Sequence, residues 1–351
     1  MFNLRVILLA IELPFVLCWT AGAASPSLSA SRVADLPNTV GVAGPFVGVA
    51  GDALIVAGGT NFPDAPPSSG GTKTWHDTAF VLPAPDGSWR EGFKLPKALA
   101  YGVSLSTADS LICLGGCTAT ENVADVFVLK WDGTSLSHEA LPSLPAPSSC
   151  QAGVLIGSKI YLAGGQPGPN PVEGPSSDYF WVLDLKDQTP QWKSLPTWPG
   201  PERFYAVAGT DGERFYMFSG IRRILNAEGQ PALEYLRDAY CFDPKSNEWS
   251  RLSDLPNANA AVASPAPLVA GGLLLIGRGA DGVKVDGPMD KRPGFSGDIL
   301  SFDVAAKKWE SIGALPFGRA AVPSATWHGG TIIASGEVGP GVRSKEVWWI
   351  K

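Results

Sequence analysis

One short stretch near the C-terminus carries the residue types that could do acid–base chemistry. The segment Gly336–Arg343 reads Gly-Glu-Val-Gly-Pro-Gly-Val-Arg, with its carboxylate and its guanidinium six residues apart across a Pro-Gly turn. A carboxylate that is withdrawn from water has a raised pKa and can act as a general base. A guanidinium can hold a carboxylate through two parallel hydrogen bonds. Glu337 and Arg343 are therefore the predicted catalytic pair, with a purely structural ion pair as the alternative.

The chain around this stretch is built from an internal repeat. A Leu-Pro pair recurs at intervals of roughly 50–60 residues, and an apolar run that ends in small residues follows each pair. The pairs begin at Leu36, Leu95, Leu144, Leu195, Leu255 and Leu315. Units of this length, with four short strands each, are typical of Kelch blades, which bury their faces by stacking around an axis. The sequence therefore predicts an all-β fold, a six-bladed Kelch-type β-propeller.

The two ends of the chain are expected to complete the same blade. The sixth unit ends at Glu346–Lys351, which supplies only a third strand. Ser31–Pro37 resembles the fourth strand of another unit, Ser250–Pro256. We therefore expect the N-terminal strand to close the sixth blade, which leaves the ring without an exposed edge.

Tryptophan and cysteine side chains are interpreted as parts of the core. A Trp precedes most later Leu-Pro pairs and is expected to pack between blades: Trp89, Trp192, Trp249 and Trp309. In the second unit the corresponding Trp131 is displaced. Beyond Cys18, for which lipidation is left open, the cysteines are Cys113, Cys117, Cys150 and Cys241. An exported protein could pair them, but no Cys-x-x-Cys spacing exists, so buried thiols are favoured over a metal site.

The composition limits the compartment and the partners. The chain has 351 residues and a net charge of −6, so it lacks the basic excess of a nucleic-acid-binding surface. Residues 1–24 resemble a secretory signal, with Arg5 ahead of an apolar run. Glu12 and Pro14 interrupt that run, so no stable membrane insertion is expected after cleavage. Residues 25–351 are predicted to form one propeller domain that is periplasmic or secreted.

Strand direction decides which face of the propeller carries a site. In each blade, the loop from the second to the third strand and the crossover into the next blade share one face, here called the upper face. Four long loops are expected there: Thr60–His76, Gln166–Ser177, Ile221–Arg237 and Ala280–Gly297. Long loops over a rigid scaffold commonly bind ligands.

Seven polar or aromatic side chains on this face are predicted to bind a substrate. Arg203 and Arg319 each follow a Leu-Pro crossover and are expected to point toward the opening of the ring. The alternative for both is a bridge to the backbone of a neighbouring blade. The other predicted substrate-binding residues are Asn61, Phe62, Trp75, His76 and Tyr101.

At these residues the chain resembles the bacterial sialic acid mutarotases (N-acetylneuraminate epimerases), a family of exported six-bladed Kelch propellers. Its pattern Gly-Glu-x-x-Pro-Gly-x-Arg is met by Gly336–Arg343. Gly41–Gly44 with Ala57–Gly59, and Ala100–Ser104 with Leu114–Gly116, are similar to further stretches of that family. The resemblance implies that Glu337 is the proton acceptor and that Arg343 helps to hold a sugar acid.

The order of these stretches differs from that of the characterised enzymes, whose C-terminal pieces stand near the N-terminus here. The chain therefore resembles a cyclically permuted relative, which a closed ring tolerates because its termini are adjacent. One departure is local: Leu99 and Ala100 stand where the family would have an Arg just before Tyr101.

The activity implied by the resemblance is the interconversion of the α and β anomers of a free sialic acid, an N-acetylneuraminate-like sugar acid. Glu337 would take the proton of the anomeric hydroxyl, the ring would open, and closure would deliver the other anomer. Arg343, with Arg203 or Arg319, would clamp the sugar carboxylate. No metal or organic cofactor is expected, since only protons move.

Three other functions are alternatives to this one. A non-catalytic Kelch module that binds a protein or glycan on the same face is the main alternative. A copper oxidase needs a cluster of His and Tyr ligands, and only the first of His76, His138 and His328 is expected on the upper face. A glycoside hydrolase needs two carboxylates that flank one bond. Glu337 would then require a partner among the loop residues Asp64, Glu173 and Asp281.

Overall fold

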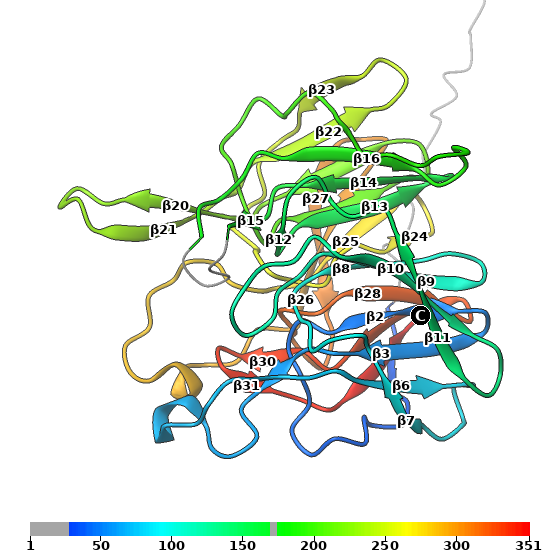
Figure 1. Ribbon diagram of the computed structural model, residues 1–351. Helices are drawn as coiled ribbons and strands as arrows, with labels where there is room; N and C mark the ends of the chain where they lie inside the picture. The colour runs from blue at the N-terminus through cyan, green and yellow to red at the C-terminus, as the bar shows by residue number, and fades with distance from the viewer. Residues whose placement is uncertain (1–27, 169–173) are drawn as a thin grey trace, which may run out of the picture.

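The computed structural model describes residues 28–168 and 174–351, which contain six four-stranded antiparallel sheets (Figure 1). The predicted signal sequence, residues 1–24, lies outside the described residues. Blade 1 consists of β2 (Phe46–Ala50), β3 (Ala53–Ala57), β6 (Thr78–Leu82) and β7 (Arg90–Lys94). Blade 2 consists of β8 (Val103–Ser106), β9 (Ser110–Leu114), β10 (Val126–Trp131) and β11 (Leu136–Leu141). Blade 3 consists of β13 (Ala152–Ile156), β14 (Lys159–Ala163), β16 (Phe180–Asp184) and β17 (Lys193–Ser194).

The second half of the ring repeats this order. Blade 4 consists of β18 (Val207–Thr210), β19 (Phe215–Phe218), β22 (Ala239–Asp243) and β23 (Glu248–Arg251). Blade 5 consists of β24 (Leu268–Val269), β25 (Leu273–Ile276), β26 (Asp298–Asp303) and β27 (Lys308–Ala314). Blade 6 consists of β28 (Ser324–Trp327), β29 (Gly330–Ala334), β32 (Val347–Ile350) and β1 (Ala30–Arg32). The all-β, six-bladed prediction is confirmed.

The blades differ in character from their inner to their outer strands. Every residue of β3 is buried, and the strand is continuously apolar because neighbouring blades cover both of its faces. The outer strand β7 is mostly exposed and carries charged residues. The apolar runs of the repeat are therefore the second strands, packed between blades.

Buried apolar clusters join each blade to the next, one cluster at each seam of the ring. The predicted inter-blade tryptophans lie against these clusters, and each indole N–H donates to a carbonyl oxygen of the preceding blade or crossover. The bonds are Trp89 to Ala34 (2.9 Å), Trp192 to Pro142 (2.9 Å), Trp249 to Pro196 (2.8 Å) and Trp309 to Ser253 (3.0 Å). Their predicted role between blades is confirmed.

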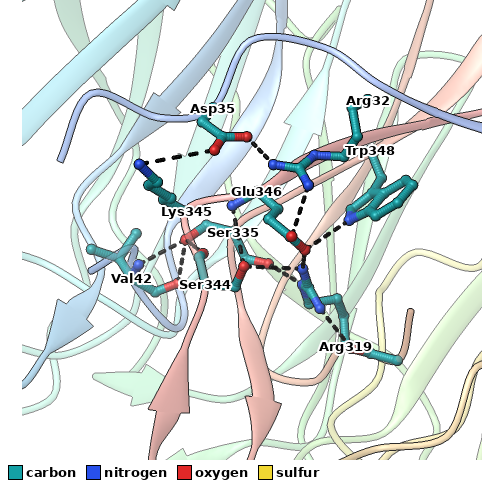
Figure 2. Close-up of polar contacts among 10 residues, drawn as sticks. Arg32, Asp35, Val42, Arg319, Ser335, Ser344, Lys345, Glu346 and Trp348 are labelled. Atoms are coloured by element: carbon teal, nitrogen blue, oxygen red, sulfur yellow. Dashed lines mark hydrogen bonds and ion pairs between the residues drawn. The ribbon is translucent and has the colours of Figure 1, made fainter. Parts of the chain in front are cut away.

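The two ends of the described chain meet in blade 6, as predicted. Strand β1 pairs with β32 in antiparallel register, with Arg32 opposite Trp348. The carboxylate of Glu346 lies between two guanidiniums, at 2.7 Å from Arg32 Nη1 and 2.5 Å from Arg319 Nη2 (Figure 2). The first blade joins the same network, because the Val42 N–H donates to Ser335 Oγ at 2.7 Å. The network thus ties the start of the chain to its last blade.

A closed circle of backbone hydrogen bonds surrounds the axis, here called the axial ring. One residue of each blade takes part: Gly44, Tyr101, Cys150, Tyr205, Ala261 and Ala321. The N–H of each donates to the carbonyl of the one before it, and Gly44 donates to Ala321, over distances of 2.6–3.0 Å. All six adopt the left-handed conformation, with φ between 51° and 62°. Five of them carry side chains, so the ring holds a backbone conformation that costs roughly 1–2 kcal/mol per residue.

Short hairpins and turns extend from the upper face. The hairpin strands are β4 (Thr60–Asn61) with β5 (Thr74–Trp75), β20 (Ile221–Leu225) with β21 (Pro231–Tyr235), and β30 (Glu337–Gly339) with β31 (Val342–Arg343). A further pair joins β12 (Ser148–Ser149) to β15 (Gln166–Pro167), and two 3₁₀ turns are η1 (Pro67–Ser69) and η2 (Met289–Lys291). Two of the four long loops predicted on this face therefore hold a hairpin, a third holds β15, which pairs with β12 outside that loop, and the fourth holds η2.

The predicted state of the cysteines is also observed. Cys113, Cys117, Cys150 and Cys241 are buried, and each has a free thiol in the described structure. Within residues 28–168 and 174–351, no helix has the length and apolarity that crossing a membrane requires.

The ion pairs of Glu346 predict a measurable contribution to the closure of the ring. Glu346→Gln keeps the shape of the side chain but leaves the buried guanidinium of Arg319 without a counter-charge. We expect a loss of about 2 kcal/mol in the free energy of unfolding, measured by chemical denaturation. Glu310→Gln, on the exposed outer strand β27, is the matched control. Equal stability of both variants would show that this network does not contribute to closure.

Candidate functional site

Glu337 and Arg343 face each other across the hairpin of blade 6. They are directly opposed in the β30–β31 pairing, and Arg343 Nη2 lies 3.1 Å from Glu337 Oε1. The side chain of Glu337 is 18% exposed, whereas that of Arg343 is only 3% exposed. The carboxylate is therefore the solvent-facing member of the pair. The ion pair is observed, and the catalytic role of Glu337 and Arg343 stays a prediction.

Loops from the two neighbouring blades hold this hairpin in place. Its turn residue Gly341 has a φ of 76°, and an added Cβ would lie 3.3 Å from both Pro67 Cγ and Met289 Sδ. Those two residues belong to η1 of blade 1 and η2 of blade 5. The same turns are bonded to each other, because Ser68 donates from its N–H and its hydroxyl to Asp290 at 3.0 and 2.7 Å. The hairpin is thus enclosed from both sides.

The surroundings of Glu337 adjust its acidity. Burial raises the pKa of its carboxyl above the ordinary value of 4.5, against the opposing charges of Arg343 and Lys73 and a backbone hydrogen bond from Gly341. A carboxylate with a raised pKa is a stronger base than one in water. The site therefore has the property that general-base catalysis requires.

Arg343 has hydrogen-bonding capacity that the described residues do not use. Its Nε and Nη1 are buried and find no partner in the described part of the chain. Its guanidinium carbon lies 4.6 Å from the ring centroid of Phe62. Leaving such donors unpaired costs about 1–3 kcal/mol each, so an anion that reached them would bind favourably. Both atoms are closed to solvent, so an anion reaches them only if surrounding side chains, of which Phe62 is one, shift.

The sequence interpretation missed Lys73, whose charge also reaches this site. Its ammonium lies 4.6 Å from the ring centroid of Tyr101 and 4.9 Å from that of Trp75. None of the described carboxylates is within ion-pair distance of Lys73. Tyr205 completes the group. Burial is the main cause that raises the pKa of Tyr205 well above its usual value, and the charge of Glu337 is one of the smaller causes. Two axial-ring tyrosines, a lysine and a carboxylate thus share one region.

Asn61 and His76 are engaged with each other. His76 Nε2 lies 2.7 Å from Asn61 Oδ1, and Asn61 Nδ2 donates to the carbonyl of Gly41 at 3.0 Å. Burial lowers the pKa of His76, and the charge of Asp77 only partly opposes this. The pair ties the first-blade loop to the crossover at Gly41. The Tyr101 hydroxyl likewise lies 2.9 Å from Thr60 Oγ1.

Arg203 does not point toward the opening, so that expectation is wrong. Its side chain is 0% exposed and makes two bonds to the carboxylate of Asp238, at 2.8 and 2.7 Å. A third bond runs to the carbonyl of Ser219 at 2.8 Å. Burial would raise the pKa of Asp238, but the bonds from Arg203 and Tyr240 outweigh it and leave that pKa lowered. The role is structural, but these bonds run to Ser219 and Asp238 of blade 4, the blade that follows Arg203, and not to the backbone of another blade as the alternative expected.

Arg319 is held in the same way in blade 6, and its predicted orientation is likewise wrong. It donates to the carbonyl of Ser335 at 3.0 Å and to Ser344 Oγ at 3.1 Å, besides its ion pair with Glu346 (Figure 2). Arg203 and Arg319 each stand two residues before an axial-ring residue. Leu99 holds the corresponding position in blade 2 and is fully buried there. The side chains at these three positions support the axial ring. The charges of Arg203 and Arg319 are already paired in that role.

A family model described as the KLHDC2/KLHL20/DRC7 Kelch-repeats domain matches residues 102–337, which is most of the chain. The chain belongs to the Kelch-repeat family. A second model, described as N-acetylneuraminate epimerase, matches residues 19–138 of this Kelch-repeat protein. The residues matched by the second model do not include Glu337 or Arg343.

Individual relatives agree with both models. The Haemophilus influenzae (strain PittEE) N-acetylneuraminate epimerase is 30% identical over 235 residues, which cover 60% of this chain and 59% of the relative. The Pasteurella multocida N-acetylneuraminate epimerase is 27% identical over 227 residues, covering 58% and 56%. A Vibrio cholerae Kelch domain-containing protein is 28% identical over 246 residues, covering 60% and 64%.

The Kelch-repeat chain thus spans less than two thirds of the length of each of these curated relatives. The similarity to N-acetylneuraminate epimerases that the sequence suggested is confirmed. The cyclic permutation stays a prediction. The second carboxylate that a glycoside hydrolase would need also stays untested. Among the loop acids named for it, Glu173 lies outside the described residues.

The raised pKa of Glu337 predicts a pH-dependent stability. The folded state keeps the Glu337 proton between the ordinary pKa of 4.5 and the raised one, whereas the unfolded chain has released it. The free energy of unfolding therefore falls as pH rises through that window. Glu337→Gln cannot titrate, so its stability relative to the natural chain should rise across the window by about 1.4 kcal/mol per unit of pKa elevation.

This comparison requires chemical denaturation of both proteins between about pH 4 and pH 8. Glu310→Gln controls for the loss of one negative charge. A stability difference that stays constant, or that turns against Glu337→Gln with rising pH, would contradict a raised pKa.

Proposed function

We propose that this Kelch-repeat protein interconverts the anomers of a free sugar acid of the sialic acid type. The observation that carries the proposal is the half-buried Glu337, paired with Arg343 on one hairpin and supplied with a raised pKa. The names of the similar epimerases support the same reaction class. Export to the periplasm or the cell exterior is part of the proposal and rests on the N-terminal sequence.

The chemistry needs one base and a confined ring-opening step. Glu337 accepts the proton of the anomeric hydroxyl, the bond between the anomeric carbon and the ring oxygen breaks, and the ring oxygen takes a proton from water. Rotation about the bond next to the new carbonyl exposes its other face. The hydroxyl then re-attacks and gives its proton to the hydroxide that the first step left, while the carbonyl oxygen recovers a proton from Glu337. Protons in and out balance, and no electron transfer occurs.

The sugar carboxylate needs a cationic partner that is not already neutralised. Arg203 and Arg319 are committed to Asp238 and Glu346, so they do not serve this role here. Lys73 lacks a described carboxylate partner and lies over Tyr101 and Trp75. Arg343 keeps two unpaired donors beside Phe62. We assign Lys73 to first contact with the carboxylate and Arg343 to the orientation of Glu337 and of the bound acid.

The direct test of the proposal is proton NMR of an α-anomer freshly released from a sialoside. The natural chain should speed equilibration above the uncatalysed rate. Glu337→Gln, which loses the base and keeps the shape, should lower kcat by about 10²–10⁴-fold. Glu310→Gln is the control for one lost carboxylate. Equal acceleration by Glu337→Gln would remove Glu337 from the mechanism.

A second prediction separates Lys73 from a structural role. Lys73→Met removes a charge that lowers the pKa of Glu337, so that pKa should rise and the acid limb of the kcat/KM profile should move to higher pH. KM should increase about tenfold, as expected when a charged hydrogen bond is lost. Lys97→Met, whose lysine pairs with Asp125 in blade 2, is the control. An unchanged pH profile would exclude Lys73 from the site.

A non-catalytic Kelch module that binds a protein or glycan is the second candidate. It is favoured by one observation, the closure of the Arg343 donors to solvent. It predicts ligand binding on the upper face without any change in the rate of anomer exchange, so the NMR experiment distinguishes the two.

A further inference from the structure

Among the described residues, the apolar cluster at the seam between blades 5 and 6 contains no tryptophan, whereas each of the other five seam clusters contains at least one. In blades 4 and 5, Trp249 and Trp309 stand six residues before the Leu of the next Leu-Pro pair. They lie opposite Phe242 and Phe302 on the third strand. In blade 6 the same position, six residues before Leu36 and opposite Ile350, is occupied by Ala30.

A cleft lies in this seam next to Ala30, and its lining includes Leu28, two residues before Ala30, and Ile350, the strand partner of Ala30. Trp249 and Trp309 each pack between their own blade and the preceding one, so the missing ring belongs between blades 5 and 6. An open cleft of about 380 Å³ occupies that seam. This volume falls in the range of small-molecule sites, about 300–1,000 Å³. Its walls are mainly apolar: Leu275, Ile299 and Leu315 from blade 5 and its crossover, and Leu28, Ile333 and Ile350 from blade 6.

The charged side chains along the cleft are all basic. Among its lining residues Arg278, Arg319 and Lys351 are cationic and none is acidic. Arg319 is neutralised by Glu346 at 2.5 Å, and Lys351 Nζ lies 3.7 Å from the ring centroid of Trp349. Among the described residues Arg278 has no ion pair; the Lys351 ammonium also has none, but it lies over the Trp349 ring.

The end of the seam near Arg278 holds more donors than acceptors. Its one bond among the described residues is from Nη1 to Asn259 Oδ1, and at 3.5 Å that bond is long. Asn259 is fully buried, and its Nδ2 finds no partner in the part of the chain that the structure describes. An anionic group at this end would satisfy the Arg278 donors that the described residues leave free, whereas Asn259 does not line the cleft.

The cleft is elongated along the strands. Arg278 lies just beyond the end of β25, and Ala270 and Gly329 line the opposite end at the turns that precede β25 and β29. Extended chain between such points, at about 3.3 Å per residue, spans roughly 15–20 Å. A straight apolar chain with one charged end matches this shape better than a compact polar ligand.

We propose that the seam between blades 5 and 6 binds an anionic amphiphile, a medium-chain fatty acid, with its carboxylate at Arg278 and its chain along the apolar walls. Ala30 opens the site by leaving out the tryptophan ring. The site is separate from Glu337, which does not line the cleft. This proposal is therefore independent of the proposed interconversion of sugar anomers.

The test is isothermal titration calorimetry of the full chain with decanoate and with decanol. Decanoate should bind saturably at one site. Arg278→Gln should weaken decanoate binding at least about tenfold and leave decanol binding unchanged. Ala30→Trp should abolish binding of both and raise the thermal unfolding midpoint. Ser31→Trp, which adds the same ring at an exposed neighbouring position, is the matched control and should bind as the natural chain does.

Ala30→Leu, a smaller filling, keeps the proposal testable if Ala30→Trp does not fold, and it should weaken both ligands. Absence of saturable decanoate binding would overturn the proposal, whether the cleft is then filled by a preceding segment or by a second copy of the chain. Unchanged binding in Ala30→Leu, or equal loss of decanoate and decanol in Arg278→Gln, would overturn it as well.

Discussion

The axial ring of six backbone hydrogen bonds is the constraint on which the arrangement of this propeller depends. Each bond joins one blade to the next, and the last returns from Gly44 to Ala321, so no blade can rotate without breaking two of them. The ring requires a left-handed backbone at five residues with side chains. That strain persists because the packing of six seams over-determines it. The ring fixes the inner ends of the blades. It therefore also fixes where each upper-face hairpin lies along the propeller axis.

The buried arginines serve this ring. Arg203 and Arg319 stand two residues before ring members, and each bonds the carbonyl at the end of a second strand and an acid at the start of a third strand. Glu346 adds Arg32 of the N-terminal strand to the same cluster, so the closure of the chain and the placement of blade 6 share one carboxylate (Figure 2). Because these charges are already satisfied, Glu337 and Arg343 are left as the pair in blade 6 with unused capacity.

The sequence predicted the architecture well because the architecture is periodic. The Leu-Pro pairs, apolar runs and tryptophans located the blades, and the similarity of Ser31–Pro37 to other fourth strands predicted the closure that β1 makes with β32. The opposition of Glu337 and Arg343 followed from a short turn between them. In contrast, Arg203 and Arg319 were assigned to the opening because periodicity places a backbone position but does not say toward which neighbour a long side chain turns.

Two other features could not be read from the sequence. Lys73 lies in a long loop outside the repeat, so its place over Tyr101 depends on loop conformation alone. The axial ring uses residue types as different as Gly, Tyr, Cys and Ala, and a left-handed backbone at the non-glycine positions leaves no compositional mark. Ala30 is different, because the sequence does contain the signal. The strand pairing places Ala30 where Trp249 and Trp309 stand in blades 4 and 5, and that equivalence shows that a large ring is absent there.

The most direct measurement of the central claim is a ¹³C NMR titration of the Glu337 carboxyl, compared with the pH dependence of kcat/KM for anomer exchange. If Glu337 is the base, the carboxyl should titrate above 4.5, its ordinary value, and the acid limb of the rate profile should show the same pKa. A Glu337 carboxyl that titrates at or below its ordinary value, or a rate profile with an unrelated pKa, would contradict the account.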